Sequence, residues 1–250
     1  MKITVITVCF NASKTIEKTI KSVLNQDYNN IEYIVIDGNS KDNTLEIIKK
    51  YSDKIGIIKS EVDRGMYDAI NKGIALASGE ILGILNADDT FASSIVLSSI
   101  AERFRSNSEA QALIGDICFV NKNGQQLRYY SSEKWSPSRF VWGVMPPHPS
   151  FYCKRELFTQ MGNYRIDFEI AADFELLIRF FKIYKVPYLY LPQLMVEMSM
   201  GGKSTKNFKS TIKINQEIKK ACRLNKLNTN YFMLYSKYFS KIFEFVNLRH

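Results

Sequence analysis

The sequence predicts an α/β fold in which a mostly parallel sheet is flanked by helices. Strand-like and helical runs alternate through the first 85 residues, a pattern typical of parallel strands joined by right-handed crossover helices. Three of the four strand-like runs are followed by turns that carry carboxylates. Because the carboxyl ends of parallel strands meet at one edge of such a sheet, we expect these turns to form one ligand-binding site.

The elements of the first half follow from residue type and spacing. The β-branched run 2–9 is expected to be a strand, and Asn11, Ala12 and Ser13 can cap a helix that continues to about Gln26. Further strands are expected at 32–36, 55–59 and 80–85, and further helices at 44–51 and 66–77.

The regular alternation stops after residue 89. A helix is expected at 93–105, and Asn123-Gly124 predicts a hairpin between the strands 112–120 and 126–130. The rest reads as an irregular segment at 137–149, a helix at 173–184, a strand at 188–191, a loop at 200–204, and helices at 208–224 and 231–248.

Composition excludes several classes of protein. An apolar fraction of 46% in 250 residues is ample for a packed core, and the lack of any run of 18 uncharged apolar residues argues against a membrane-spanning helix. The N-terminus runs directly into the first predicted strand and lacks a small-residue cleavage site, so we expect it to be part of the fold and not a signal peptide. Four cysteines without CxxC spacing argue against a zinc site or a disulfide framework and indicate a reducing cytoplasm.

The basic charge is confined to the end of the chain. Residues 1–202 carry 23 basic and 23 acidic side chains, whereas residues 203–250 carry 11 and 2. Two interpretations of this tail remain open: a helix pair that packs on the domain with a solvated basic face, or an interfacial helix that rests on anionic lipid. Nucleic-acid binding is not expected, because no recognition motif is present.

The carboxylates after the strands have the chemistry of a metal–phosphate site. Asp37, Asp63 and the run Asn86-Ala87-Asp88-Asp89 each follow a predicted strand. Oxygen ligands of this kind suit Mg²⁺ or Mn²⁺ that bridges phosphates. One such residue could merely cap the next helix, but three in series favour a site.

Four motifs in this order are similar to those of the family 2 glycosyltransferases, which are inverting enzymes with the GT-A fold. They are Thr7-Val8-Cys9-Phe10-Asn11, the run 37–44 (DGNSKDNT), the run 63–73 (DRGMYDAINKG) and Asn86-Ala87-Asp88-Asp89. The third motif resembles a bacterial subgroup that builds O-antigen and capsule repeat units. The resemblance implies a GT-A domain over residues 1–204, with a nucleotide-sugar-binding half at 1–110 and an acceptor-binding half at 111–204. The charge pattern adds a basic amphipathic helical tail at 205–250.

The resemblance also implies roles for residues of the donor site. Asp37 matches the carboxylate that bonds the uracil of a UDP-sugar, and Thr7 and Asn11 match the nucleotide-facing edge of the first strand. Asp63 and Arg64 match donor contacts.

The resemblance places the metal and the chemistry at two further motifs. Asp88 matches the carboxylate that holds Mn²⁺ or Mg²⁺, within a donor-lining run that includes Asn86 and Ala87. Asp173 matches the catalytic base.

Two departures from the family pattern change this assignment. Asn86 stands where an Asp-X-Asp motif usually begins, so Asp88 would carry the metal with Asp89 in support. Ala172 stands where an acidic residue usually precedes the base. These departures leave open a degenerate glycan-binding or scaffold subunit. A nucleotidyltransferase is a weaker alternative, because no Gly-rich phosphate loop follows the first strand.

Two residues outside these motifs have open roles. His148, in a Pro-rich loop, is either a contact to the acceptor or diphosphate or a structural hydrogen-bonding residue. Lys203 lies in a Gly-rich loop that is either a hinge or a mobile loop that closes on the donor diphosphate. Arg179 is expected to be structural.

The whole pattern implies one reaction. A sugar would move from a UDP-sugar to a polyprenyl-diphosphate-linked saccharide by single displacement, with a divalent metal on the leaving diphosphate and one carboxylate as base. The expected place is the inner face of the cytoplasmic membrane, with the basic tail on its surface.

Overall fold

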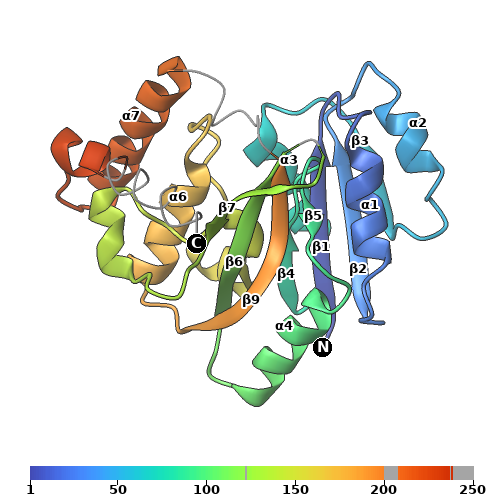
Figure 1. The fold of residues 1–250 in the computed structure, drawn as a ribbon, viewed down its shortest axis with the longest axis horizontal. Coiled ribbons are helices and arrows are strands. Elements are labelled where there is room, and N and C mark those ends of the chain that lie inside the picture. Colours follow the sequence, from blue (N-terminus) through green and yellow to red (C-terminus); the bar gives the residue numbers. More distant parts are fainter. Residues whose placement is uncertain (122, 200–207, 237, 239–250) are drawn as a thin grey trace.

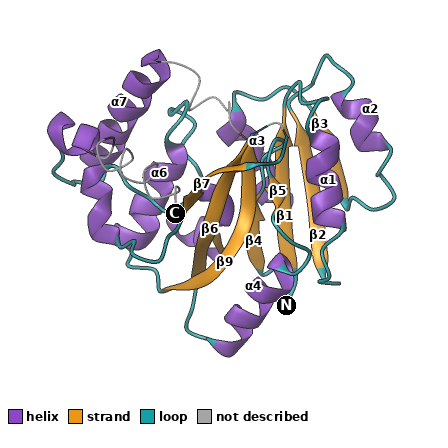
Figure 2. Ribbon diagram, in the orientation of Figure 1, coloured by secondary structure: helices purple, strands orange, loops and turns teal. Residues whose placement is uncertain are grey.

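The computed structural model describes residues 1–250 except 122, 200–207, 237 and 239–250 (Figure 1). The described residues form one nine-stranded mixed sheet in the order β3-β2-β1-β4-β8-β6-β9-β5, with β7 paired to β6. The sheet is flanked by helices on both faces, as the sequence predicts (Figure 2).

The first four strands of the sheet are parallel, as expected from the alternating pattern. They are β1 (Ile3–Cys9), β2 (Ile31–Asp37), β3 (Ile57–Ser60) and β4 (Ile81–Ile84). The central strand β1 lies between β2 and β4, so the loop after β1 lies between the two loops that carry the predicted carboxylates.

The second half of the sheet is mixed. Its strands are β5 (Thr90–Phe91), β6 (Ala112–Val120), β7 (Gln126–Tyr130), β8 (Tyr152–Lys154) and β9 (Tyr188–Ser199). The predicted hairpin is present as β6 and β7, and β8 joins the halves by pairing antiparallel with both β4 and β6. Strand β9 continues well past residue 191, where the sequence predicts its end, with irregular register against β6.

Helices cover both faces of the sheet. One face packs against α1 (Ile16–Leu24), α2 (Thr44–Lys49) and α4 (Val96–Ser106). The other face packs against α3 (Met66–Leu76), α5 (Glu156–Met161) and α6 (Ala172–Leu177). Side chains of β1 alternate between these two cores, as the two-residue period of a strand requires.

Two predicted helices differ in detail. Helix α1 begins at Ile16 behind Thr15, whose side chain makes no capping bond, so the cap expected at residues 11–13 is absent. Asn11 adopts φ +50° and accepts a hydrogen bond from the backbone N–H of Lys41 instead. The helix expected at 173–184 begins as α6 and continues as the π-helical turn η3 (Ile178–Ile183). The segment expected to be irregular contains the 3₁₀ turns η1 (Pro137–Trp142) and η2 (His148–Ser150).

The described part of the basic tail packs on the domain. Helix α7 (Phe208–Leu224) lies beside α6 (Figure 1), and Ile218, Ala221 and Cys222 are buried in the same core as α6. Residues 231–236 form a further helical turn, in which Leu234 is buried. The domain boundary expected at residue 204 and most of the last predicted helix lie outside the described residues. Within the described residues, no helix combines the length and hydropathy that a membrane crossing requires.

Candidate functional site

The predicted polar turns lie at the carboxyl edge of the parallel strands. Asp37 ends β2, Asp63 lies in the loop after β3, and the Asn86–Asp89 run follows β4. The loops after β2 and β3 touch closely, since a Cβ atom placed on Gly38 would lie 2.4 Å from Asp63 Oδ2. The topology therefore brings these turns to one edge, as expected.

Asp37 is fully buried and held in place by serines. Its carboxylate accepts hydrogen bonds from the Ser40 hydroxyl at 2.5 Å and the Ser60 hydroxyl at 2.6 Å. The backbone N–H of Ser40 donates to both carboxylate oxygens. Asp37 thus fixes the loop that begins at Gly38.

Thr7 does not face the site. Its side chain is fully buried, and its hydroxyl accepts a hydrogen bond from Tyr33 at 3.1 Å. The expectation that Thr7 faces a nucleotide is therefore wrong for its side chain, because odd-numbered residues of β1 point into the core under α1. Asn11 is exposed and joins the loop after β1 to the loop after β2 through Ser40 and Lys41.

Arg64 is exposed and bound to the first turn of α3. Its guanidinium lies 3.1 Å from Asp68, and its backbone N–H donates to the same carboxylate. Asp63 accepts a hydrogen bond from the N–H of Gly65, whose φ of +118° allows the sharp entry into α3. Both predicted donor contacts therefore belong to a compact turn beside the Asp37 loop.

The Asn86–Asp89 run carries buried side-chain oxygen atoms. Burial raises the pKa of Asp88, and burial together with the neighbouring Asp88 charge raises the pKa of Asp89 to about 8. Asp89 is bonded by the Asn86 amide at 3.3 Å and by the Ser199 backbone. Asn86 Oδ1 is buried and, among the described residues, has no hydrogen-bond partner.

These residues fit a divalent cation with partial coordination. The half-buried Asp88 carboxylate, the buried Asp89 carboxylate and the unpaired amide oxygen of Asn86 would be stabilised by a hard cation, which prefers oxygen ligands. The described residues contain no group of three or more His, Cys, Asp or Glu side chains that could enclose a metal. A cation here would therefore draw its other ligands from phosphate oxygens and water, as Mg²⁺ commonly does.

Asp173 lies in the first turn of α6 and contacts α3. Its Oδ1 accepts hydrogen bonds from the N–H of Phe174 at 2.8 Å and the hydroxyl of Tyr67 at 3.2 Å. Burial raises the pKa of Asp173 to about 6, and the nearby Glu217 charge raises it further while the hydrogen bonds oppose the shift. A carboxylate with this pKa is mostly ionised at neutral pH and is a stronger base than an exposed one.

His148 is part of the packing behind Asp173. It is buried, its Nε2 lies 2.7 Å from the Tyr164 hydroxyl, and burial lowers the pKa of His148 to about 4. Tyr164 in turn stacks on Tyr67 with ring centroids 5.8 Å apart. The structural interpretation of His148 is the one these contacts favour, since the imidazole bonds Tyr164, whose ring packs on the Tyr67 that bonds Asp173.

The sequence does not predict the roles of two residues near Asp173. Tyr67 lies within a recognised motif, but nothing in its spacing reveals a partner more than 100 residues away. Glu217 lies in α7 and accepts hydrogen bonds from three successive backbone N–H groups, those of Glu169, Ile170 and Ala171. Only a tertiary contact between α7 and the segment before α6 discloses this role.

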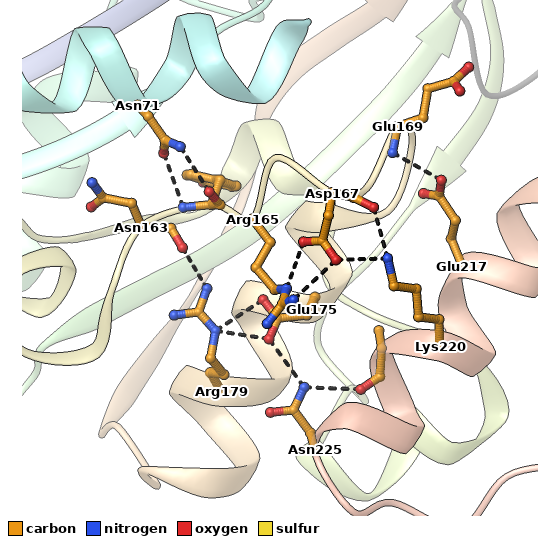
Figure 3. A network of polar contacts seen from close by, with 12 residues as sticks. Asn71, Asn163, Arg165, Asp167, Glu169, Glu175, Arg179, Glu217, Lys220 and Asn225 are labelled. Atoms are coloured by element: carbon orange, nitrogen blue, oxygen red, sulfur yellow. Dashed lines mark hydrogen bonds and ion pairs between the residues drawn. The ribbon is translucent and has the colours of Figure 1, made fainter. Parts of the chain in front are cut away.

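A polar network joins α6, α7 and the segment between α5 and α6 (Figure 3). Arg179 pairs with Glu175 at 3.0 Å and donates to the carbonyls of residues 161–163. This network gives Arg179 the structural role expected of it. Lys203 lies outside the described residues.

Comparison with known proteins identifies the family. A family model described as glycosyl transferase family 2 matches residues 4–171. An uncharacterized glycosyltransferase of Mycobacterium tuberculosis is 33% identical over 179 residues, which cover 71% of this chain and 68% of that protein.

Solved structures show the same fold at low identity. Staphylococcus aureus TarS 1–349 in complex with UDP-GlcNAc matches with a TM-score of 0.72 and 19% identity, over 90% of this chain and 65% of that one. The mannosyltransferase PcManGT of Pyrobaculum calidifontis, in complex with GDP-Man and Mn²⁺, matches with a TM-score of 0.66 and 22% identity, over 89% and 64%. The family model covers most of this chain, and the fold is that of these GT-A enzymes. The chain therefore belongs to glycosyl transferase family 2 and is a glycosyltransferase.

Proposed function

We propose that this glycosyltransferase moves a hexose or N-acetylhexosamine from a UDP-sugar to a lipid-diphosphate-linked saccharide in the synthesis of a bacterial surface polysaccharide. The observation that carries the proposal is the pair of a half-buried Asp88 and a buried Asp89 carboxylate beside the unpaired oxygen of Asn86. A nucleoside diphosphate with a divalent cation satisfies all three groups.

The donor part of the proposal rests on the edge formed by β1, β2 and β4. The base and ribose would lie over the loops of Asp37 and Asn11, beside the turn of Asp63 and Arg64. Asp37 favours UDP by resemblance, and UDP-GlcNAc is the ligand of the TarS complex. Lys203 is proposed to counter the diphosphate charge.

The metal part of the proposal assigns Mn²⁺ or Mg²⁺ to Asp88, with Asp89 and the Asn86 oxygen in support. When bound, the cation would act as a Lewis acid toward the departing diphosphate. The mannosyltransferase complex contains Mn²⁺, which makes Mn²⁺ the first metal to test.

Asp173 is proposed to take the proton from the acceptor hydroxyl. One carboxylate suffices, because direct displacement needs a base on the face of the sugar opposite the leaving group and no covalent intermediate. An α-linked donor would then give a β-linked product. Tyr67 keeps Asp173 oriented by donating to Oδ1.

The acceptor part of the proposal places the chain on the inner face of the cytoplasmic membrane. A groove of about 460 Å³ lies along α7 and the turn after it. Its lining includes Lys219, Lys220, Arg223, Lys226 and Tyr231. Phe232, 82% exposed, follows directly. Basic side chains beside exposed aromatic rings are typical of surfaces that rest on anionic lipid.

The membrane proposal is tested by sedimentation with vesicles. Arg223→Glu/Lys226→Glu should lose most binding to phosphatidylglycerol vesicles, while wild type should not bind phosphatidylcholine vesicles. Lys49→Glu/Lys54→Glu is the matched control, because it makes the same charge change at exposed positions around α2. An equal loss of vesicle binding in both variants would show that only the net charge matters, and would contradict the proposed membrane surface.

The catalytic proposal is tested by UDP release from a panel of UDP-sugars, with UDP-GlcNAc first. Asp88→Ala should weaken donor binding, while Asp173→Asn should lower turnover by about 10²- to 10⁴-fold, the usual contribution of a general base, with donor binding intact. Full activity in both variants would refute the mechanism. Binding of UDP-sugar without turnover in wild type, even with acceptor present, would favour the glycan-binding subunit.

A further inference from the structure

We propose that Glu217 is a positioning residue for the base: from α7, its carboxylate fixes the backbone of residues 169–171 and thereby the place of the Asp173 side chain. The inference rests on the proposed function, since it concerns the residue assigned there as the base.

The contact is a cap made by a side chain distant in sequence. Glu217 Oε1 accepts from the N–H of Glu169 at 2.9 Å, and Oε2 accepts from those of Ile170 and Ala171 at 2.8 and 2.9 Å. Successive N–H groups that converge in this way form an anion-binding concavity. These groups precede α6, whose own N-terminal residues provide no side-chain cap. Figure 3 shows Glu217 reaching from α7 toward Glu169.

The peptide group between Ile170 and Ala171 is held from both sides. The N–H of Ala171 donates to Glu217 at 2.9 Å, and the carbonyl of Ile170 accepts a hydrogen bond from the Tyr67 hydroxyl at 2.6 Å. The same hydroxyl also reaches Asp173 Oδ1 at 3.2 Å. A displacement of this peptide would therefore move the Tyr67 hydroxyl and Asp173 together, because all three share one set of hydrogen bonds.

The Glu217 contact differs from the other contacts between α7 and the segment before α6. Lys213 pairs with Glu169, and Lys220 pairs with Asp167 at 2.8 Å, both through exposed or half-exposed side chains. Lys220 also donates to the carbonyl of Asp167 at 2.8 Å. Such pairs contribute little to stability. Glu217 instead joins its charge to backbone donors, and charge-assisted bonds of this type are about twice as strong as neutral ones. Among the described contacts between α7 and this segment, Glu217 is the one that holds three successive backbone N–H groups.

The charge of Glu217 also acts on Asp173 through space. Among the described residues, Tyr67 from α3, Tyr164 from the segment before α6 and Glu217 from α7 are titratable groups that interact with the Asp173 carboxyl. Burial is the main cause of the raised pKa of Asp173, the Tyr67 bond lowers it, and the Glu217 charge raises it. Loss of this charge should therefore lower the pKa of Asp173, which a purely structural contact would not do.

The test compares Glu217→Gln with Lys213→Ala in the full chain. The first readout needs no substrate: ¹³C NMR titration of the Asp173 carboxyl, assigned with Asp173→Asn, and hydrogen exchange of the 169–171 amides. Glu217→Gln should lower the pKa of Asp173 and speed this exchange, while Lys213→Ala should change neither. An unchanged titration and unchanged exchange in folded Glu217→Gln would overturn the inference.

The second readout is UDP release from UDP-GlcNAc. Glu217→Gln should lower kcat by about 10- to 100-fold with KM for the donor unchanged, since small displacements of a reacting group have effects of this size. Glu217→Asp, which keeps the charge, should retain more activity. If Asp173→Asn inactivates the enzyme while Glu217→Gln has wild-type kcat, only the positioning role fails. If Asp173→Asn is active, the proposed base itself fails.

Discussion

The pKa of the proposed base, Asp173 of α6, depends on a hydrogen bond from Tyr67 of α3. The carboxyl has a pKa of about 6 because burial outweighs the hydrogen bonds from Tyr67 and Phe174. A base must be ionised to act, so turnover should fall about tenfold per pH unit below pH 6. A pH–rate profile of UDP release, with no acid limb between pH 5 and 7, would contradict this assignment.

The Tyr67 hydroxyl gives a second prediction, because its effect on the pKa of Asp173 is opposite to that of the Glu217 charge. Tyr67→Phe removes a donor that favours the ionised carboxylate, so the pKa of Asp173 should rise and the acid limb should move to higher pH. The ring packing on Tyr164 would remain. We expect kcat at pH 7 to fall by about tenfold, measured by UDP release, with donor KM unchanged. A limb displaced to lower pH would show that the bond favours the neutral acid.

At the same scale, the sequence predicts residue types at strand ends better than side-chain directions. The positions of Asp37, Asn86 and Asp88 follow from strand order alone. The inward direction of Thr7 depends on which face of β1 meets α1. Glu217 was missed because its partners are backbone groups that no sequence spacing marks.

Strands β4 and β8, which join the two halves of the sheet, pack closely where Gly83 meets the ring of Tyr152. Strand β4 pairs with β8 with Gly83 opposite Tyr152, and a Cβ at Gly83 would lie 2.1 Å from the Tyr152 ring. Gly83→Ala should lower the free energy of unfolding by about 1–3 kcal/mol through overpacking. Urea denaturation measures this change. An unaltered midpoint would mean that the ring moves freely, against the tight packing described.

Tyr152 supplies the complementary prediction. Its hydroxyl is buried and, among the described residues, has no hydrogen-bond partner. Tyr152→Phe should raise the free energy of unfolding by about 1 kcal/mol, because an unsatisfied buried polar group is removed while the ring is kept. The same denaturation experiment measures it, and a loss of stability would indicate a partner such as a bound water.

Elements were predictable where the pattern is long and regular. The alternating first half, the β6–β7 hairpin and α7 are where the sequence places them. The strands β5 and β8 have two and three residues, and so carry no periodic pattern. The extension of β9 to Ser199 depends on pairing with β6, a tertiary interaction.

At the scale of the whole molecule, the tail is part of the architecture around the site. Helix α7 shares a core with α6 and contacts the segment before Asp173, while its outer side lines the basic groove. One helix thus connects the proposed lipid surface with the proposed base. The charge asymmetry of the sequence predicts the surface, but only the packing of α7 reveals the connection.

The central claim is that the carboxylates after β4 bind a nucleoside diphosphate through a divalent cation. Titration calorimetry of UDP, with and without Mn²⁺ and with GDP and CDP as controls, tests it most directly. We predict UDP binding that requires Mn²⁺, exceeds that of GDP and CDP, and is weakened at least about tenfold by Asp88→Ala, the loss of one charged ligand. UDP binding that is equal without Mn²⁺ and unchanged by Asp88→Ala would contradict the account.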